Sequence, residues 1–270
     1  MLTRIISGAA LIIVVGGVLV IGNFFPIVLA SFIAIISAVA CYEILNNTGI
    51  IKKKIVTLGS CVYAVLSVFS HLGYTEKLWE GLSNEFFTVI YAVFVVAVAL
   101  AYNKEFGLSC IAAALAFPIV ITYSFSSLAQ LYLGENGVFY LLLLLNFSSI
   151  CDTGAYFTGV LLGKHKLCPN ISPKKTVEGA VGGIVWSLIC SVILCFAFSK
   201  TDILLYLAIA TVPFCIIGMC GDLFASVIKR SVDLKDYGNL IPGHGGILDR
   251  FDSILLIAPV LSLCVQGGLH

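Results

Sequence analysis

The chain has 270 residues, of which 60% are hydrophobic and only 11% are charged. Globular proteins carry about 25% charged residues, so this composition excludes a water-soluble fold, which would lack the polar surface it needs. The net charge is +1, which points to neither nucleic acid nor an acidic partner, and we expect no nucleic acid to bind.

Nine apolar stretches approach the roughly 20 residues that a helix needs to cross the hydrocarbon core of a bilayer. In chain order they cover residues 5–22, 24–45, 55–73, 86–102, 107–133, 137–162, 177–199, 203–228 and 253–268. Long apolar runs without alternation exclude a membrane β-barrel, so all nine are predicted to be helices. The sequence therefore predicts an all-α, polytopic integral membrane protein with about nine transmembrane helices.

The positions of the basic residues predict the orientation of these spans. If the N-terminus is cytoplasmic, 13 of the 15 lysines and arginines fall on the cytoplasmic side, and only Lys77 and Lys200 fall outside. Basic residues concentrate in cytoplasmic loops of membrane proteins. We therefore predict a cytoplasmic N-terminus in a multi-pass protein of the cell (inner) membrane.

The first segment rich in polar residues covers residues 163–178. Ser172 and Pro173 form a good N-cap and first-turn pair, which predicts that the seventh helix begins there. Lys174 and Lys175 would then oppose the helix dipole, and a bound phosphate would resolve that conflict. The alternative is that these lysines only set the topology. Glu178 is a candidate substrate contact, or simply an acid that complements the dipole.

The second polar segment covers residues 221–253 and begins at the end of the eighth span. If that helix continues through Arg230, then Asp222, Ser226, Lys229 and Arg230 share one face. The backbone amides of the Pro-Gly-His-Gly-Gly stretch at 242–246 could approach a ligand closely, because glycine has no side chain. Within that loop, a structural role for His244 is as plausible as a role as a base or phosphate donor.

Acidic residues near the predicted cytoplasmic ends of three spans indicate a metal site. Asp152 lies in an apolar run, where an aspartate costs about 2.5–3.5 kcal/mol on insertion scales, so it is expected to be functional unless it only pairs with a lysine or caps a broken helix. Asp249 and Asp252 share a face at a spacing of three residues. With Asp222 they are expected to converge and bind a divalent cation, since Mg²⁺ prefers carboxylate and phosphate oxygens. Glu43 is interpreted as merely interfacial.

The string from Ser226 to Asp252 resembles the diagnostic pattern of the phosphatidate cytidylyltransferase (CDP-diacylglycerol synthase) family. It includes Lys229-Arg230, Lys235-Asp236 and the run Leu240-Ile-Pro-Gly-His-Gly-Gly-Ile-Leu-Asp-Arg-Phe-Asp. The segments that begin at Asp152 and at Ser172 resemble the same family in the same order. Because the sequence shows no internal repeat and no low-complexity linker, we treat residues 1–270 as a single membrane domain. The specific motifs divide it into less specific N-terminal spans in 1–135 and a catalytic half in 137–270.

The resemblance implies an all-helical enzyme, typically a homodimer, that converts CTP and phosphatidic acid from the bilayer to CDP-diacylglycerol and pyrophosphate at the cytoplasmic face. It implies a two-cation centre, with Mg²⁺ as the expected metal and K⁺ as a candidate second cation. The candidate catalytic residues are Asp222, Asp249, Lys229, Arg230 and His244, and the candidate metal ligands are Asp152, Asp222, Asp249 and Asp252. The candidate substrate-binding residues are Ser172, Lys174, Lys175, Glu178, Ser226, Lys235, Asp236, Gly245, Gly246 and Arg250.

Other functions would use similar polar groups. A CTP-dependent lipid kinase, or a cytidylyltransferase that acts on another lipid phosphate, is the nearest enzymatic alternative. A transporter would need charged groups near the membrane midplane with access from both sides. The outer ends of these spans lack matching polar clusters, so the sequence favours an enzyme over a transporter or a structural scaffold.

Overall fold

The computed structural model describes residues 2–103 and 106–268, with side chains from Ile6 onward. Helices dominate the described chain, and its only sheet is a two-stranded hairpin, which confirms the predicted all-α class. The chain forms two compact units. The first unit runs to Leu133 and includes Val232–Phe251, whereas the second contains Gly134–Ser231 and the residues from Asp252 on. The single membrane domain stays a prediction.

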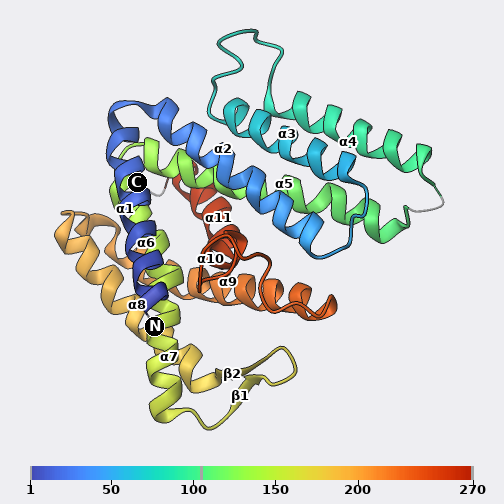
Figure 1. Ribbon diagram of the computed structural model, residues 1–270. Helices are drawn as coiled ribbons and strands as arrows, with labels where there is room; N and C mark the ends of the chain where they lie inside the picture. Colours follow the sequence, from blue (N-terminus) through green and yellow to red (C-terminus); the bar gives the residue numbers. More distant parts are fainter. Residues whose placement is uncertain (1, 104–105, 269–270) are drawn as a thin grey trace. The chain divides into compact units, whose positions relative to one another are not determined.

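The first unit is built from five long helices and a short one (Figure 1). They are α1 (Leu2–Phe24), α2 (Pro26–Tyr42), α3 (Lys54–His71), α4 (Asn84–Ala101), α5 (Leu108–Leu133) and α10 (Leu248–Phe251). Pro26 is the first residue of α2, where a missing N–H leaves no hydrogen bond unmade. A π-helical turn, η1 (Glu43–Asn47), continues α2, and α2 packs against α3 and α5 to form the core of this unit.

A buried polar contact ties three of these helices together. The hydroxyl of Tyr91 on α4 donates to the carbonyl oxygen of Ala114 on α5 at 2.6 Å and lies 2.7 Å from Ser60 Oγ on α3. A buried hydroxyl without a partner is costly, so this contact fixes how the three helices pack.

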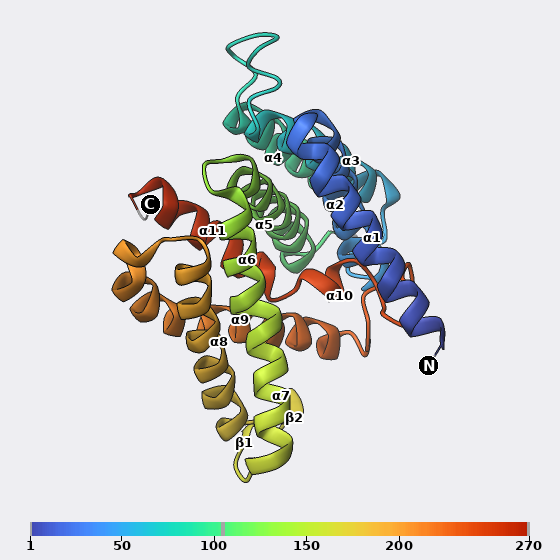
Figure 2. The same cartoon turned by 90° about the vertical axis from the view of Figure 1, so that its left-hand side faces the viewer.

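The second unit contains a span that includes a π-turn, a hairpin and three further helices. Its elements are α6 (Gly137–Leu145), the π-turn η2 (Asn146–Ile150), α7 (Cys151–Leu162), β1 (Lys166–Cys168), β2 (Ser172–Thr176), α8 (Val177–Ala197), the 3₁₀ turn η3 (Thr201–Ile203), α9 (Leu204–Ser231) and α11 (Ile254–Gln266). Figure 2 shows α6 and α7 as one continuous rod with the hairpin beside its far end. The strands β1 and β2 are antiparallel.

Glycines allow α7 and α8 to pack closely. A Cβ on Gly183 of α8 would lie 2.6 Å from the carbonyl oxygen of Cys151, and a Cβ on Gly154 of α7 would lie 2.7 Å from the Trp186 side chain. Small residues at such contacts are typical of helix pairs in membranes, where backbones must approach to gain packing energy. The first turn of α7, which carries Asp152, is therefore held firmly against α8.

Eight of the described helical segments are long and apolar enough to cross a membrane, in agreement with the first eight predicted spans. The ninth is shorter than expected: α11 has 13 residues, or about 20 Å at 1.5 Å per residue, against a hydrocarbon core of about 30 Å. Large apolar side chains such as Ile13 and Ile193 are exposed, as expected for faces that contact lipid. The cytoplasmic N-terminus stays a prediction. Lys104, one of the basic residues counted for that orientation, lies outside the described residues.

The prediction that the seventh helix begins at Ser172 is wrong. Residues Ser172–Thr176 form strand β2, and α8 begins at Val177. The hydroxyl of Thr176 accepts a hydrogen bond from the Gly179 amide at 3.1 Å and thus acts as the N-cap. Lys174 and Lys175 are consequently strand residues rather than first-turn residues, and the predicted conflict with the helix dipole does not arise.

Candidate functional site

Three of the predicted metal ligands lie together in the second unit. Asp152 is in the first turn of α7, Asp222 is on α9, and Asp252 directly precedes the turn into α11. Each carboxylate is close enough to the other two to interact electrostatically. A Cβ on Gly221 would lie 2.8 Å from the carbonyl oxygen of Asp252, so this glycine allows α9 to bring Asp222 beside Asp252.

Lys175 supplies positive charge to this cluster. Its Nζ lies 2.5 Å from Asp222 Oδ2, and the exposed fractions of the two side chains are 23% and 25%. The lysine ammonium carries three N–H groups, and this one ion pair does not use all of them. The remaining N–H groups are therefore able to donate to an anion such as a phosphate.

The cluster holds more negative charge than its surroundings compensate. Burial, reinforced by the charge of Asp222, raises the pKa of Asp252 to about 7, although Lys229 opposes the shift. The Ser253 side chain interacts with the Asp152 carboxylate. An added cation would relieve the repulsion among these carboxylates.

The donor set suits a hard divalent cation that takes few protein ligands. Asp152, Asp222 and Asp252 offer only oxygen atoms, the ligands that Mg²⁺ prefers. Over residues 2–103 and 106–268, no three His, Cys, Asp or Glu side chains are already arranged to hold a metal ion. A metal here would therefore complete its coordination with water and substrate phosphate, which is usual for Mg²⁺.

A cavity of about 520 Å³ adjoins the cluster. Its polar lining includes Asp152, Asp222, Lys174 and Lys175, all from the second unit. Apolar side chains complete the wall, including Tyr156, Val160, Leu167 and Met219. Lysines, carboxylates and an apolar wall in one cavity suit a ligand with phosphate groups and an apolar part.

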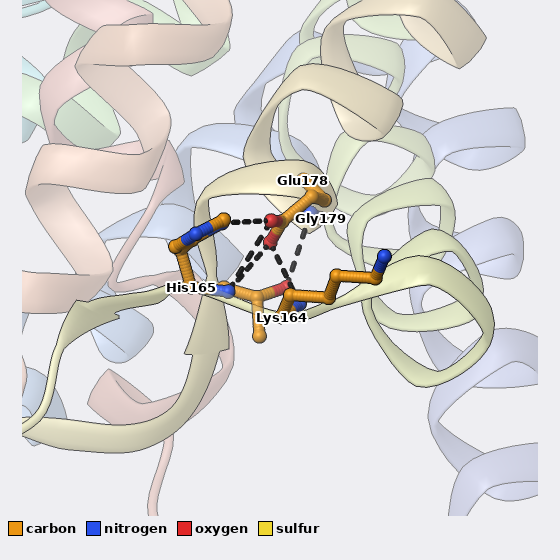
Figure 3. Close-up of polar contacts among 5 residues, drawn as sticks. Lys164, His165, Glu178 and Gly179 are labelled. Atoms are coloured by element: carbon orange, nitrogen blue, oxygen red, sulfur yellow. Dashed lines mark hydrogen bonds and ion pairs between the residues drawn. The ribbon is translucent and has the colours of Figure 1, made fainter.

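Glu178 has a structural contact at the base of the hairpin (Figure 3). Its carboxylate accepts hydrogen bonds from the backbone amides of Lys164 and His165, each at 3.1 Å, and lies 2.6 Å from His165 Nδ1. These contacts fix the entry into the hairpin that carries Ser172, Lys174 and Lys175. A substrate contact for Glu178 stays a prediction.

The helix α9 continues through Ser231, as the predicted shared face of Asp222, Ser226, Lys229 and Arg230 requires. Lys229 interacts electrostatically with Asp252. The basic end of α9 is thereby linked to the acidic cluster. The expected shared helical face of Asp249 and Asp252 is not formed, because α10 ends at Phe251.

Asp249 belongs to the first unit, where it organises the motif segment. The side chain is 6% exposed, and its Oδ2 accepts hydrogen bonds from the backbone amides of Tyr237 at 2.8 Å and Gly246 at 3.0 Å. These bonds close the segment between Tyr237 and Asp249 into a loop. The convergence of Asp249 with the other three aspartates stays a prediction.

The remaining motif residues lie on or beside the same loop. His244 Nδ1 is 2.9 Å from Ser7 Oγ on α1, so α1 orients the imidazole ring. Gly245 has a φ of 85°, a conformation that favours glycine. Three candidate substrate-binding residues are exposed around this loop: Lys235, Asp236 and Arg250.

Sequence reasoning missed the buried role of Glu43. It is 3% exposed, and its carboxylate accepts hydrogen bonds from the backbone amides of Ile247 at 3.0 Å and Leu248 at 2.9 Å. The available signal was the one used for Asp152, an acid at the end of an apolar run. Its partners could not be identified because they lie about 200 residues further along the chain.

The Cytidylyltransferase family model matches residues 2–267. The phosphatidate cytidylyltransferase of Staphylococcus haemolyticus is 43% identical over 129 residues, 48% of this chain and 50% of that protein. That of Bacillus subtilis is 51% identical over 110 residues, 41% of each chain. That of Staphylococcus saprophyticus is 42% identical over 147 residues, 53% of this chain and 56% of the relative. The chain thus spans about half the length of the curated relatives it matches.

Proposed function

Because the chain belongs to the cytidylyltransferase family, we propose that it is a nucleotidyltransferase that joins the cytidylyl group of CTP to phosphatidic acid. The products are CDP-diacylglycerol and pyrophosphate. The observation that carries the proposal is the cavity of the second unit, which Lys174, Lys175, Asp152 and Asp222 line together and in which Lys175 pairs with Asp222. Relatives named phosphatidate cytidylyltransferase support the choice of reaction.

The proposed reaction is one displacement at phosphorus. A phosphate oxygen of phosphatidate forms a bond to the α-phosphorus of CTP, while the bond from that phosphorus to the oxygen bridging the α- and β-phosphates breaks. Pyrophosphate leaves with the electron pair of the broken bond. Phosphatidate is already an anion, so no strong general base is needed, and positioning and charge stabilisation supply the catalysis.

The residues of the cavity suit these tasks. Lys174 and Lys175 would bind and orient phosphate oxygens, with Lys229, Arg230 and Lys235 as further candidates for nucleotide contacts. When bound, Mg²⁺ would supply positive charge to the phosphate oxygens as negative charge develops on the leaving pyrophosphate. Asp152, Asp222 and Asp252 would hold it in the second unit, with Asp249 as a further candidate ligand. A second cation, such as K⁺, is part of the same proposal.

The setting of the reaction is also proposed. The eight apolar helices make this a multi-pass membrane protein. The uneven distribution of lysines and arginines supports a site that faces the cytoplasm, and the cell inner membrane is the proposed location. Phosphatidate would then reach the site from the bilayer, and CTP from the cytoplasm. A homodimer is the proposed assembly.

The test is an assay of purified protein in lipid nanodiscs with phosphatidate, Mg²⁺ and CTP labelled at either the α- or the γ-phosphate. We expect label from the α-phosphate in a cytidine-bearing lipid and label from the γ-phosphate only in pyrophosphate. Asp222→Asn should abolish turnover while the protein still inserts and purifies normally. Transfer of the γ-label to lipid would instead identify a CTP-dependent lipid kinase.

A further inference from the structure

Glu43 is a buried acid whose carboxylate accepts two backbone hydrogen bonds from a loop about 200 residues further along the chain. It opens the π-turn η1 directly after α2. One oxygen of the carboxylate accepts from the Ile247 amide and the other from the Leu248 amide. A buried carboxylate is stable only when its oxygens are well paired, so these two bonds fix α10 against the end of α2.

The same carboxylate explains two glycines of the motif. A Cβ on Gly246 would lie 2.5 Å from both Glu43 oxygens, and a Cβ on Gly238 would lie 2.6 Å from Oε1. Neither glycine has the positive φ that Gly245 shows, so backbone conformation does not require glycine at these two positions. The space that the Glu43 carboxylate occupies does.

The loop that Glu43 holds is also the loop that holds Asp249. The Gly246 amide donates to Asp249 Oδ2, and the next two amides donate to Glu43. At the other end of the loop, Asn47 Nδ2 on η1 donates to the Tyr237 carbonyl oxygen at 2.7 Å, while the Tyr237 amide donates to Asp249. The π-turn therefore fixes both sides of the Asp249 carboxylate through consecutive backbone groups.

We propose that Glu43 is a positioning residue, which sets the place and orientation of the Asp249 carboxylate by binding the amides of Ile247 and Leu248. The inference rests on the proposed function in one respect, namely that Asp249 serves the cytidylyl transfer. Glu43 itself touches no reacting atom in this scheme. Its effect on the rate is transmitted through the loop. The direct link is Gly246, which donates to Asp249 and lies against the Glu43 carboxylate.

The first test measures turnover of Glu43→Gln and Glu43→Ala in the nanodisc assay. A small misplacement of a reacting group by a distant mutation can cost about 100-fold in rate, so we expect kcat to fall roughly 10- to 100-fold in Glu43→Ala. Glutamine keeps one acceptor oxygen and should lose less. The exposed Glu76 provides the matched control, since Glu76→Gln should leave kcat unchanged. Wild-type kcat in a folded Glu43→Ala protein would overturn the proposal.

The second test uses the steric contact with Gly246. Gly246→Ala should lower kcat strongly when Glu43 is present, and by a clearly smaller factor in the Glu43→Ala background, where the space is empty. Gly16→Ala is the control, because a Cβ on Gly16 has open space around it. An equal factor for Gly246→Ala in both backgrounds would show that Glu43 does not set this loop.

A third measurement does not depend on activity. Amide hydrogen exchange over residues 236–251 should be faster in Glu43→Gln than in wild type, with the largest change at Ile247 and Leu248, and unchanged in Glu76→Gln. Unchanged exchange at these amides would refute the positioning role. If wild-type protein makes no CDP-diacylglycerol but Glu43→Gln speeds exchange, the proposed function fails and the positioning of Asp249 stands.

Discussion

Replacing Lys175 with methionine should destabilise the second unit, because it leaves the carboxylates of Asp152 and Asp222 without the cation that interacts with both. The Lys175–Asp222 pair is about three-quarters buried. Breaking a fully buried pair costs about 3–5 kcal/mol, and an exposed pair contributes about 0.2–1 kcal/mol. An intermediate loss of about 2 kcal/mol is expected here, which corresponds to a fall in Tm on the order of 5 °C.

The assay is thermal unfolding of the metal-free protein in detergent, followed by tryptophan fluorescence. Lys174→Met is the matched control, since Lys174 neighbours Lys175 on β2 but is exposed, and it should change Tm little. The double variant Lys175→Met/Asp222→Asn should recover part of the lost stability, because it removes one of the crowded charges. The reasoning is refuted if Lys175→Met unfolds with the wild-type Tm, or if adding Asp222→Asn lowers Tm further.

Two further predictions concern the same unit. The pKa of Asp252 is raised to about 7 in the folded protein and is about 3.9 when unfolded. Its contribution to stability is therefore full below about pH 4 and is lost as the pH rises towards 7. Asp252→Asn should flatten this decline in unfolding experiments on the metal-free protein, and an unchanged pH profile would contradict the prediction. Gly183→Val would place a Cβ 2.6 Å from the Cys151 carbonyl oxygen and should cost about 1–3 kcal/mol, measured as a lower Tm, whereas a wild-type Tm would show that α7 and α8 can separate freely.

Hydropathy predicted most of the fold because lipid leaves few alternatives for an apolar segment. A backbone in hydrocarbon must satisfy its own hydrogen bonds, so each long apolar run becomes a helix wherever its neighbours lie. The start of α8 was harder, since Ser172-Pro173 and Thr176 both satisfy the local preferences for a helix N-terminus. Pairing of β2 with β1 removes the first option, and that pairing is not encoded in either local signal.

The candidate site could be predicted as a set of residues but not as an arrangement. The sequence grouped Asp152, Asp222, Asp249 and Asp252 as one acidic cluster, and the structure brings Asp152, Asp222 and Asp252 together in the second unit. It also identified Lys175 as a phosphate contact, but from a helix that does not form there. Residue types indicate chemistry at a site, whereas the element that carries each residue is decided by contacts far along the chain.

The two π-turns show how acids are accommodated in otherwise apolar helices. Glu43 is the first residue of η1, and Asp152 follows η2 by two residues. A π-turn interrupts the regular hydrogen-bond ladder, and such turns often occur at functional sites. In η2, Asn146 donates to the Ser187 carbonyl oxygen and to Ser191 Oγ on α8, which anchors the span ahead of Asp152. In η1, Asn47 anchors the motif loop while Glu43 binds its far end. In both units, therefore, an irregular turn carries an amide side chain that donates a hydrogen bond to another segment close to a carboxylate, so the turn that interrupts the helix also anchors the backbone beside its acid.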